Sequence, residues 1–148
     1  MITTLIAVVG TLLGAALTGA WQHLTTVSGR RDRDHQAQRA AVAQLLGAAT
    51  AHRAAQFLKH VARREGEPET AEARASRYAA RTAVTQALTG VRLSGVPAHL
   101  QALAVDLVAA SVAVGDAPSG DHQAVDAAGA AARIAHEALE TAAAQHLA

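Results

Sequence analysis

Eight histidines offer the widest choice of chemistry in this sequence, because an imidazole can ligate a metal or move a proton near neutral pH. They are His23, His35, His52, His60, His99, His122, His136 and His146. None forms an HxxxH pair or an HExxH motif, and no Glu-x-x-His occurs, which is the spacing of di-iron sites in helical bundles. We therefore predict no metal site and no cofactor.

Motifs for nucleophilic catalysis or phosphate binding are also missing. The chain has no cysteine, no GxSxG nucleophile elbow, no GxxxxGK[ST] and no GxGxxG following a strand. We predict no catalytic residue, and we do not expect an enzyme.

Three arginines are the remaining candidate functional residues. Arg74, Arg77 and Arg81 lie three or four residues apart, which places them on one side of a helix. They are candidate contacts for a phosphate group or an acidic partner. The alternative is a solvated face that pairs with Glu69, Glu72 or a neighbouring helix, which is the more common role of such a set.

The composition favours one all-α domain. Of 148 residues, 51% are hydrophobic and 17% are charged, and only Trp21, Phe57 and Tyr78 are aromatic. Strands that need aromatic pairs are therefore poorly supplied, whereas abundant alanine favours helix. The net charge of +1 argues against a dedicated DNA-binding protein, so we do not expect direct contact with nucleic acid.

The N-terminal segment has the composition of a membrane anchor. No charged residue occurs from Met1 to Gly29, and Ile2 to Trp21 is a 20-residue apolar run, long enough to span a bilayer as a helix. Trp21 is placed as an interface anchor where this run ends. Basic residues then follow, so positive-inside reasoning predicts a single pass with the N-terminus outside and the remainder in the cytoplasm. The arginines expected at the inner leaflet are Arg30, Arg31, Arg33 and Arg39.

Two alternatives for this segment stay open. Thr18-Gly19-Ala20 is an acceptable signal-peptidase site, although the basic n-region of a signal peptide is missing. The segment is also apolar enough to be a buried helix of a soluble protein. The one-sided basic flank favours an uncleaved anchor.

Small residues form two adjacent rows on the predicted membrane helix. Such rows allow close approach of helices in lipid, so we expect a homo-oligomer formed through this face. The residues are Gly10, Gly14 and Thr18 in one row and Thr11, Ala15 and Gly19 in the other.

The predicted fold is all-α, with one N-terminal transmembrane helix continuing into an antiparallel cytoplasmic four-helix bundle. The anchor occupies 1–24 and the bundle 25–148, with helices over about 30–65, 68–89, 97–114 and 121–147. Pro and Gly mark the breaks at 65–70, 94–97 and 115–121.

Apolar residues recur every three or four positions within each predicted bundle helix. The first has Val42, Leu45, Leu46, Ala49, Phe57, Leu58 and Val61, with a gap at His52 and Arg53. The second has Ala75, Tyr78, Ala79, Thr82 and Leu88. The third has Leu100, Leu103, Leu107, Ala110 and Val114, and the fourth has Val125, Ala128, Ala132, Ala135, Leu139 and Ala142.

The charge changes sign along the bundle. Residues 22–65 hold eight basic and three acidic groups, a charge of +5, whereas 66–148 hold five and nine, a charge of −4. A basic membrane-proximal helix suits an anionic inner leaflet.

The start of the chain resembles that of small actinobacterial membrane proteins of the KilB plasmid-spread type. The resemblance is carried by Thr4 to Ala15, by Trp21-Gln22-His23 and by the Arg/Gln-rich helix that follows. It extends to an aromatic near the end of the long helix, Phe57, and to Val91-Arg92-Leu93 before a Pro-initiated helix. It implies a membrane-associated protein of conjugative elements that helps plasmid DNA to spread between mycelial compartments, with no catalytic residues.

These observations predict a non-enzymatic membrane-anchored interaction protein that is an accessory to plasmid transfer or spread. Its expected partners are the membrane, further copies of itself and other transfer or membrane proteins. The alternative is a sensor whose bundle binds a small apolar ligand or a soluble partner; a cavity lined by Leu100, Leu103, Leu107 and Leu139 would favour that function.

Overall fold

The structure, a computed structural model, describes the backbone of residues 2–147 and the side chains of residues 31–147. The described chain contains four helices and no strand: α1 (Ile2–Arg64), α2 (Ala71–Leu93), α3 (Ala98–Asp116) and α4 (His122–His146). The all-α prediction is therefore confirmed. The chain divides into two units, Met1–Gln36 and Ala37–Ala148. The predicted anchor boundary at 24/25 stays a prediction.

The side chains of the predicted membrane anchor lie outside the described residues. They include those of Gly10, Thr11, Gly14, Ala15, Thr18, Gly19 and Trp21, and the side chain of the predicted inner-leaflet residue Arg30 also lies outside the described residues. Within the described part of the chain, α3 has the length and apolar composition needed to cross a membrane. Its Leu100, Leu107 and Val114 are fully buried against the other helices, as is typical of the core helix of a bundle.

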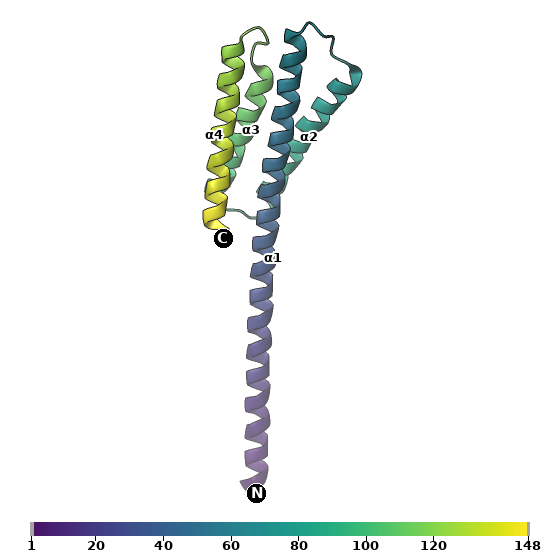
Figure 1. Ribbon diagram of the computed structural model, residues 1–148. Helices are drawn as coiled ribbons and strands as arrows, with labels where there is room; N and C mark the ends of the chain where they lie inside the picture. Colours follow the sequence, from purple (N-terminus) through teal and green to yellow (C-terminus); the bar gives the residue numbers. More distant parts are fainter. Residues whose placement is uncertain (1, 148) are drawn as a thin grey trace. The chain divides into compact units, whose positions relative to one another are not determined.

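Within Ala37–Ala148 the helices pack side by side and neighbours along the chain alternate in direction (Figure 1). Contacts from α1 fix these directions. Arg39 donates to the carbonyl of Leu147, and Arg53 Nη2 lies 3.3 Å from His136 Nδ1, so α4 runs opposite to α1. Lys59 reaches the last turn of α3, so α3 runs in the same direction as α1.

The helix ends follow local capping chemistry. Thr70 accepts a hydrogen bond from the amide of Ala73, so α2 begins at Ala71, three residues after Pro68, where the sequence placed its start. Gly95, with a φ of +74°, follows the end of α2 at Leu93. This end lies beyond the predicted residue 89 because Val91 is fully buried, and its burial favours a further helical turn.

One apolar cluster joins all four helices. It takes Val42, Leu45 and Ala49 from α1, Val84, Ala87 and Val91 from α2, Leu100, Ala104 and Leu107 from α3, Leu139 and Ala143 from α4, and the flanking Val96 and Leu147. The seams predicted for the last two helices are confirmed at their main positions, since Leu107, Val114, Val125, Ala132 and Leu139 are all buried.

The predicted apolar stripe is wrong for the second half of α1. Leu58 is 69% exposed, and the buried positions are His52, Gln56 and His60 instead. Phe57 is half-buried and packs on Gly129, where a Cβ would lie 2.7 Å from its ring. The apolar pattern predicted the wrong face because large apolar residues flank the buried row of His52, Gln56 and His60 on both sides.

The predicted inner face of α2 is wrong as well. Tyr78 is 66% exposed, and no residue of α2 before Val84 is buried. Only the C-terminal half of α2 is buried in the bundle, while its first three turns diverge from α1 (Figure 1). An apolar groove therefore opens between the two helices.

Candidate functional site

Polar side chains are buried where α1, α2 and α3 meet near the end of α3. His52, Gln56 and His60 lie four residues apart on α1 and are 2%, 8% and 6% exposed, and Ser111 of α3 is fully buried. The atoms without a hydrogen-bond partner among the described residues include His52 Nδ1, Gln56 Oε1, His60 Nδ1 and Ser111 Oγ. Each such atom costs about 1–3 kcal/mol, so this cluster is not explained by stability alone.

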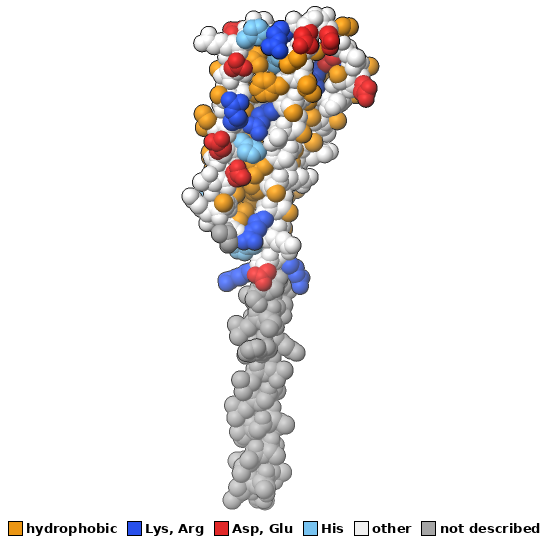
Figure 2. All heavy atoms as spheres, in the orientation of Figure 1, with side chains coloured by type: hydrophobic (Ala, Val, Ile, Leu, Met, Phe, Trp, Pro, Cys, Tyr) orange, Lys and Arg blue, Asp and Glu red, His pale blue; other side chains and the backbone are white. Residues whose placement is uncertain are grey.

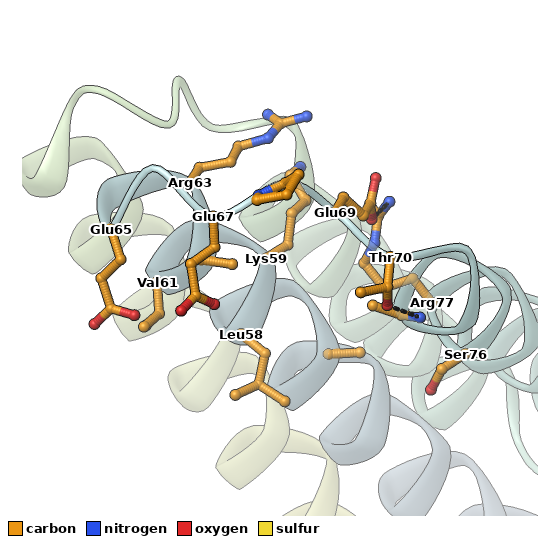
Figure 3. Close-up of a pocket in the computed structure, with 14 residues that line it drawn as sticks. Leu58, Lys59, Val61, Arg63, Glu65, Glu67, Glu69, Thr70, Ser76 and Arg77 are labelled. Carbon is orange, nitrogen blue, oxygen red and sulfur yellow. Dashed lines mark hydrogen bonds and ion pairs between the residues drawn. The ribbon is translucent and has the colours of Figure 1, made fainter.

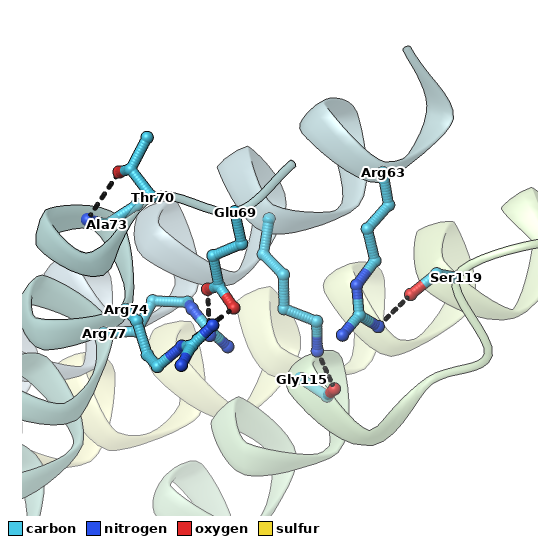
Figure 4. Close-up of polar contacts among 9 residues, drawn as sticks. Arg63, Glu69, Thr70, Ala73, Arg74, Arg77, Gly115 and Ser119 are labelled. Atoms are coloured by element: carbon cyan, nitrogen blue, oxygen red, sulfur yellow. Dashed lines mark hydrogen bonds and ion pairs between the residues drawn. The ribbon is translucent and has the colours of Figure 1, made fainter. Parts of the chain in front are cut away.

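Basic side chains of α1 hold the C-terminal end of α3 (Figure 4). Lys59 Nζ donates to the carbonyl of Gly115 at 2.6 Å, and Arg63 donates to Ser119 Oγ at 2.9 Å. His60 Nε2 lies 2.8 Å from the carbonyl oxygen of Val114, which only accepts, so Nε2 carries the proton. Cations at this end of a helix stabilise its last carbonyls and oppose the helix dipole.

Gly115 allows the two helices to approach at this point. A Cβ on Gly115 would lie 2.7 Å from the Cδ atom of Gln56, so the amide of Gln56 packs directly on the backbone of α3. A larger residue at position 115 would displace Gln56.

The three arginines predicted to contact a partner differ in their pairing within the chain. Glu69 accepts a hydrogen bond from Arg77, and its other carboxylate oxygen lies 3.5 Å from Arg74 Nε (Figure 4). The side chain of Arg81 makes no hydrogen bond or ion pair to residues 31–147. Pairing within the chain therefore occupies Arg74 and Arg77, and contact with a partner stays a prediction.

Arg81 borders a small polar cleft of about 170 Å³. The cleft is lined by His52, Gln56, Lys59, Arg77, Tyr78, Arg81, Val112, Gly115 and Asp116. Burial lowers the pKa of His52, and Arg81 lowers it further, against the opposing effect of Asp116. Burial, Arg63 and Arg77 lower the pKa of Lys59, whereas Asp116 and Glu69 raise it. Lys59, Arg77 and Arg81 thus line this cleft together with one carboxylate residue, Asp116.

A second, larger groove lies between the end of α1 and the beginning of α2 (Figure 3). Its volume is about 420 Å³, and its apolar lining includes Leu58, Val61 and Pro68, with charged side chains such as Glu65 and Arg63 at its edges. The diverging first turns of α2 leave this groove open to solvent.

The structure gives no support to a metal centre in the part of the chain whose side chains it describes. No group of three or more His, Asp or Glu side chains is placed to hold an ion within residues 31–147. The buried His52 instead lines a cleft with Gln56 and Lys59, and His60 bonds to the carbonyl of Val114.

The remaining predicted site residues are exposed on α1. Arg31 and Arg33 carry exposed side chains, and Arg39 is exposed while donating to the carbonyl of Leu147. Their contact with an inner leaflet stays a prediction.

The sequence contains one signal for the polar cluster, which is the position of its residues on α1. His52, Gln56 and His60 continue, at a spacing of four, the row that begins with Val42 and Ala49. The gap noted at His52 was therefore the inner face itself.

Comparison with known proteins places this chain in a family. The model of the KilB plasmid transfer protein family matches residues 39–147, which nearly coincide with the unit Ala37–Ala148. The chain is 44% identical over 93 residues to Protein KilB of Streptomyces lividans, an alignment that covers 62% of this chain and 63% of that relative. The match thus spans less than two thirds of the length of the relative. No solved structure matches the chain. The chain belongs to the KilB plasmid transfer protein family, and the resemblance inferred from its sequence is confirmed.

Proposed function

We propose that this chain is a non-enzymatic, membrane-anchored helical interaction protein that assists the transfer or spread of a plasmid. The observation that carries this proposal is the family match over residues 39–147, because it covers the helical bundle rather than the N-terminal apolar run. We infer that the bundle performs the family role, whereas the proposed anchor is supported by the apolar run of residues 2–21.

The solvent face of α1 supports a role in self-association. Exposed residues recur there every three or four positions and carry no charge; they are Ala40, Ala43, Gly47, Ala51, Ala54 and Leu58. The charged residues within this stretch, Arg53 and Lys59, contact α4 and α3 instead. An outer helix face normally carries charged residues, so this face suits contact with the same face of a second copy.

The surface of the bundle offers other sites for protein partners. On the face shown in Figure 2, hydrophobic side chains lie among basic and acidic ones. We propose other transfer or membrane proteins as partners of this surface. The net charge of +1 supports no direct role for nucleic acid.

The proposed topology has the N-terminus outside and the bundle in the cytoplasm. Its support is the position of the arginines after the apolar run. A reporter fused to Ala148 should be active only in the cytoplasm, and the mature chain should retain Met1 or Ile2. A mature protein that begins at Trp21 would contradict the anchor.

The association of the anchors is tested by a double substitution. Gly10→Ile with Gly14→Ile adds hydrophobicity, so the chain should still insert, but the larger side chains should separate the helices. Crosslinking in membranes and plasmid transfer should both fall sharply at an unchanged protein level. Val9→Ile with Leu13→Ile, on the side of the predicted helix opposite the small-residue rows, is the control and should have no effect.

A single substitution tests the exposed face of α1 separately. Ala51→Glu places a charge on the uncharged face and should reduce crosslinking between bundles and plasmid transfer. Ala131→Glu makes the same change at an exposed position of α4 and should reduce neither. Equal behaviour of the two variants would show that this face of α1 is not an interface.

The alternative of a sensor that binds a small apolar ligand would be favoured by a cavity lined by Leu100, Leu103, Leu107 and Leu139. Three of these, Leu100, Leu107 and Leu139, are fully buried in the apolar cluster, and none of the four lines the two clefts described above. The observations therefore favour the interaction protein.

A further inference from the structure

We propose that the polar cleft between α1, α2 and α3 is a binding site for a small phosphate-class anion, either free phosphate or the phosphate group of a small molecule. The cleft lies entirely within residues 52–116 and is distinct from the exposed face of α1. The proposal concerns the purified chain, so it does not depend on a role in plasmid transfer.

Cations surround the cleft from two helices. Lys59 comes from α1, and Arg77 and Arg81 come from α2, one helical turn apart. Arg77 is neutralised by Glu69, but Arg81 has no ion pair within the described residues and Lys59 donates only to an uncharged carbonyl. Burial is the main cause of the lowered pKa values of His52 and Lys59; Arg81 lowers that of His52 further, and Arg63 and Arg77 lower that of Lys59 further. A bound anion would relieve the repulsion among these groups.

Hydrogen-bond donors without partners are already buried at the site. His52 is 2% exposed and lines the cleft, yet its ring makes no hydrogen bond to the described residues. Arg77 Nε is a further buried donor without an acceptor, whereas the unpartnered atom of Gln56 is its oxygen Oε1, which cannot donate. An anion in the cleft would accept from Arg77 Nε–H and from the N–H of the His52 ring and so compensate for their desolvation.

The volume of the cleft is sufficient for a small anion. About 170 Å³ holds one phosphate group with a few water molecules, since each water occupies about 30 Å³ in the liquid. We favour a dianion over a carboxylate because Lys59 and Arg81 approach from different helices and both gain from the second charge.

Asp116 is the opposing charge at the cleft and provides a sharp test. Its carboxylate lines the same space and would repel an anion. Arg81→Gln and Asp116→Asn are therefore expected to change the affinity in opposite directions. Both residues are exposed, so neither substitution removes a side chain from the core.

The experiment follows binding of inorganic phosphate to the full chain in detergent by NMR of the arginine Nε–Hε groups. The Arg77 signal should shift saturably with phosphate. Arg81→Gln should raise the Kd roughly tenfold through loss of a charge-assisted hydrogen bond. Asp116→Asn should lower the Kd, by about threefold for weak repulsion at a solvated cleft. Arg92→Gln, an exposed position of α2 outside the cleft, is the matched control and should leave the Kd unchanged.

Three results would overturn the proposal. The first is a shift of the Arg77 signal that rises without saturation. The second is an equal shift with acetate or chloride at the same ionic strength, which would show general screening. The third is the same Kd for Arg81→Gln and Arg92→Gln.

Discussion

The two halves of α1 within the bundle bury different chemistry along one continuous row. Val42, Leu45 and Ala49 enter the apolar cluster that joins all four helices. Three residues after Ala49 along the same face, His52 and then Gln56 and His60 are also buried but leave polar atoms without partners. The two halves of α2, which lie beside these two parts of α1, also differ in what they bury.

The part of α2 that lies beside each half of the α1 row explains why the two halves bury different residues. Beside the apolar half, α2 contributes Val84, Ala87 and Val91. Beside the polar half, the first turns of α2 bury no residue, and the cleft and the groove open there. We infer that the apolar half supplies most of the stability, whereas the polar half is held by hydrogen bonds to the end of α3 and retains room for a ligand.

The largest expected effect is a loss of apolar volume from the cluster. Leu107→Ala should lower the free energy of unfolding by about 2–5 kcal/mol, because Leu107 is fully buried and its removal leaves a cavity. Leu58→Ala makes the same change at an exposed position and should cost less than about 0.5 kcal/mol. Urea unfolding of the full chain in detergent measures both. Similar losses for the two variants would contradict the assigned inner face of α1.

The next effect comes from overfilling a close contact. Ala132 is fully buried on α4, so Ala132→Leu should overpack the bundle at a cost of about 1–3 kcal/mol. Ala131→Leu, at the adjacent exposed position, is the control. An unchanged melting temperature for Ala132→Leu would show that this seam faces solvent.

A substitution in the polar half of the α1 row should raise the free energy of unfolding. Gln56→Met keeps an unbranched side chain of similar length and removes a buried oxygen that has no hydrogen-bond partner among the described residues. We expect the free energy of unfolding to rise by about 1 kcal/mol, measured without phosphate. A decrease would mean that the amide of Gln56 is satisfied and that the two halves of the row contribute alike.

The smallest effect is a dependence of stability on pH. Burial lowers the pKa of His52 and of His136, with further lowering by Arg81 and Arg53 respectively. The unfolded chain therefore binds protons more strongly than the folded chain. The stability is fully present above the ordinary histidine pKa of about 6.5 and falls as the pH drops toward the lowered values.

Urea unfolding between pH 7.5 and 5.5 measures this loss. His52→Gln should reduce the loss, whereas His35→Gln, at an exposed position in Met1–Gln36, should leave it unchanged. An equal loss of stability in the unsubstituted chain and in both variants would show that the titrating group is not His52.

The sequence predicted the helices of the bundle well and its polar site poorly. The seams of α3 and α4 were found because Leu107 and Leu139 recur with a strong apolar period and short breaks separate the helices. The inner row of α1 was missed after Ala49 because a pattern of apolar residues assigns Phe57 and Leu58 to the core and His52 to the surface.

The sequence by itself determined the helical class, the positions of the breaks, the family and the seams of α3 and α4, because these follow from local propensity and from the spacing of apolar residues along one helix. The tertiary structure alone decided that His52, Gln56 and His60 turn inward and that Arg81, Lys59 and Asp116 border one cleft. The reason is geometric. Which row of a helix is buried depends on where its neighbours lie, and α2 packs into the bundle through only one of its two halves.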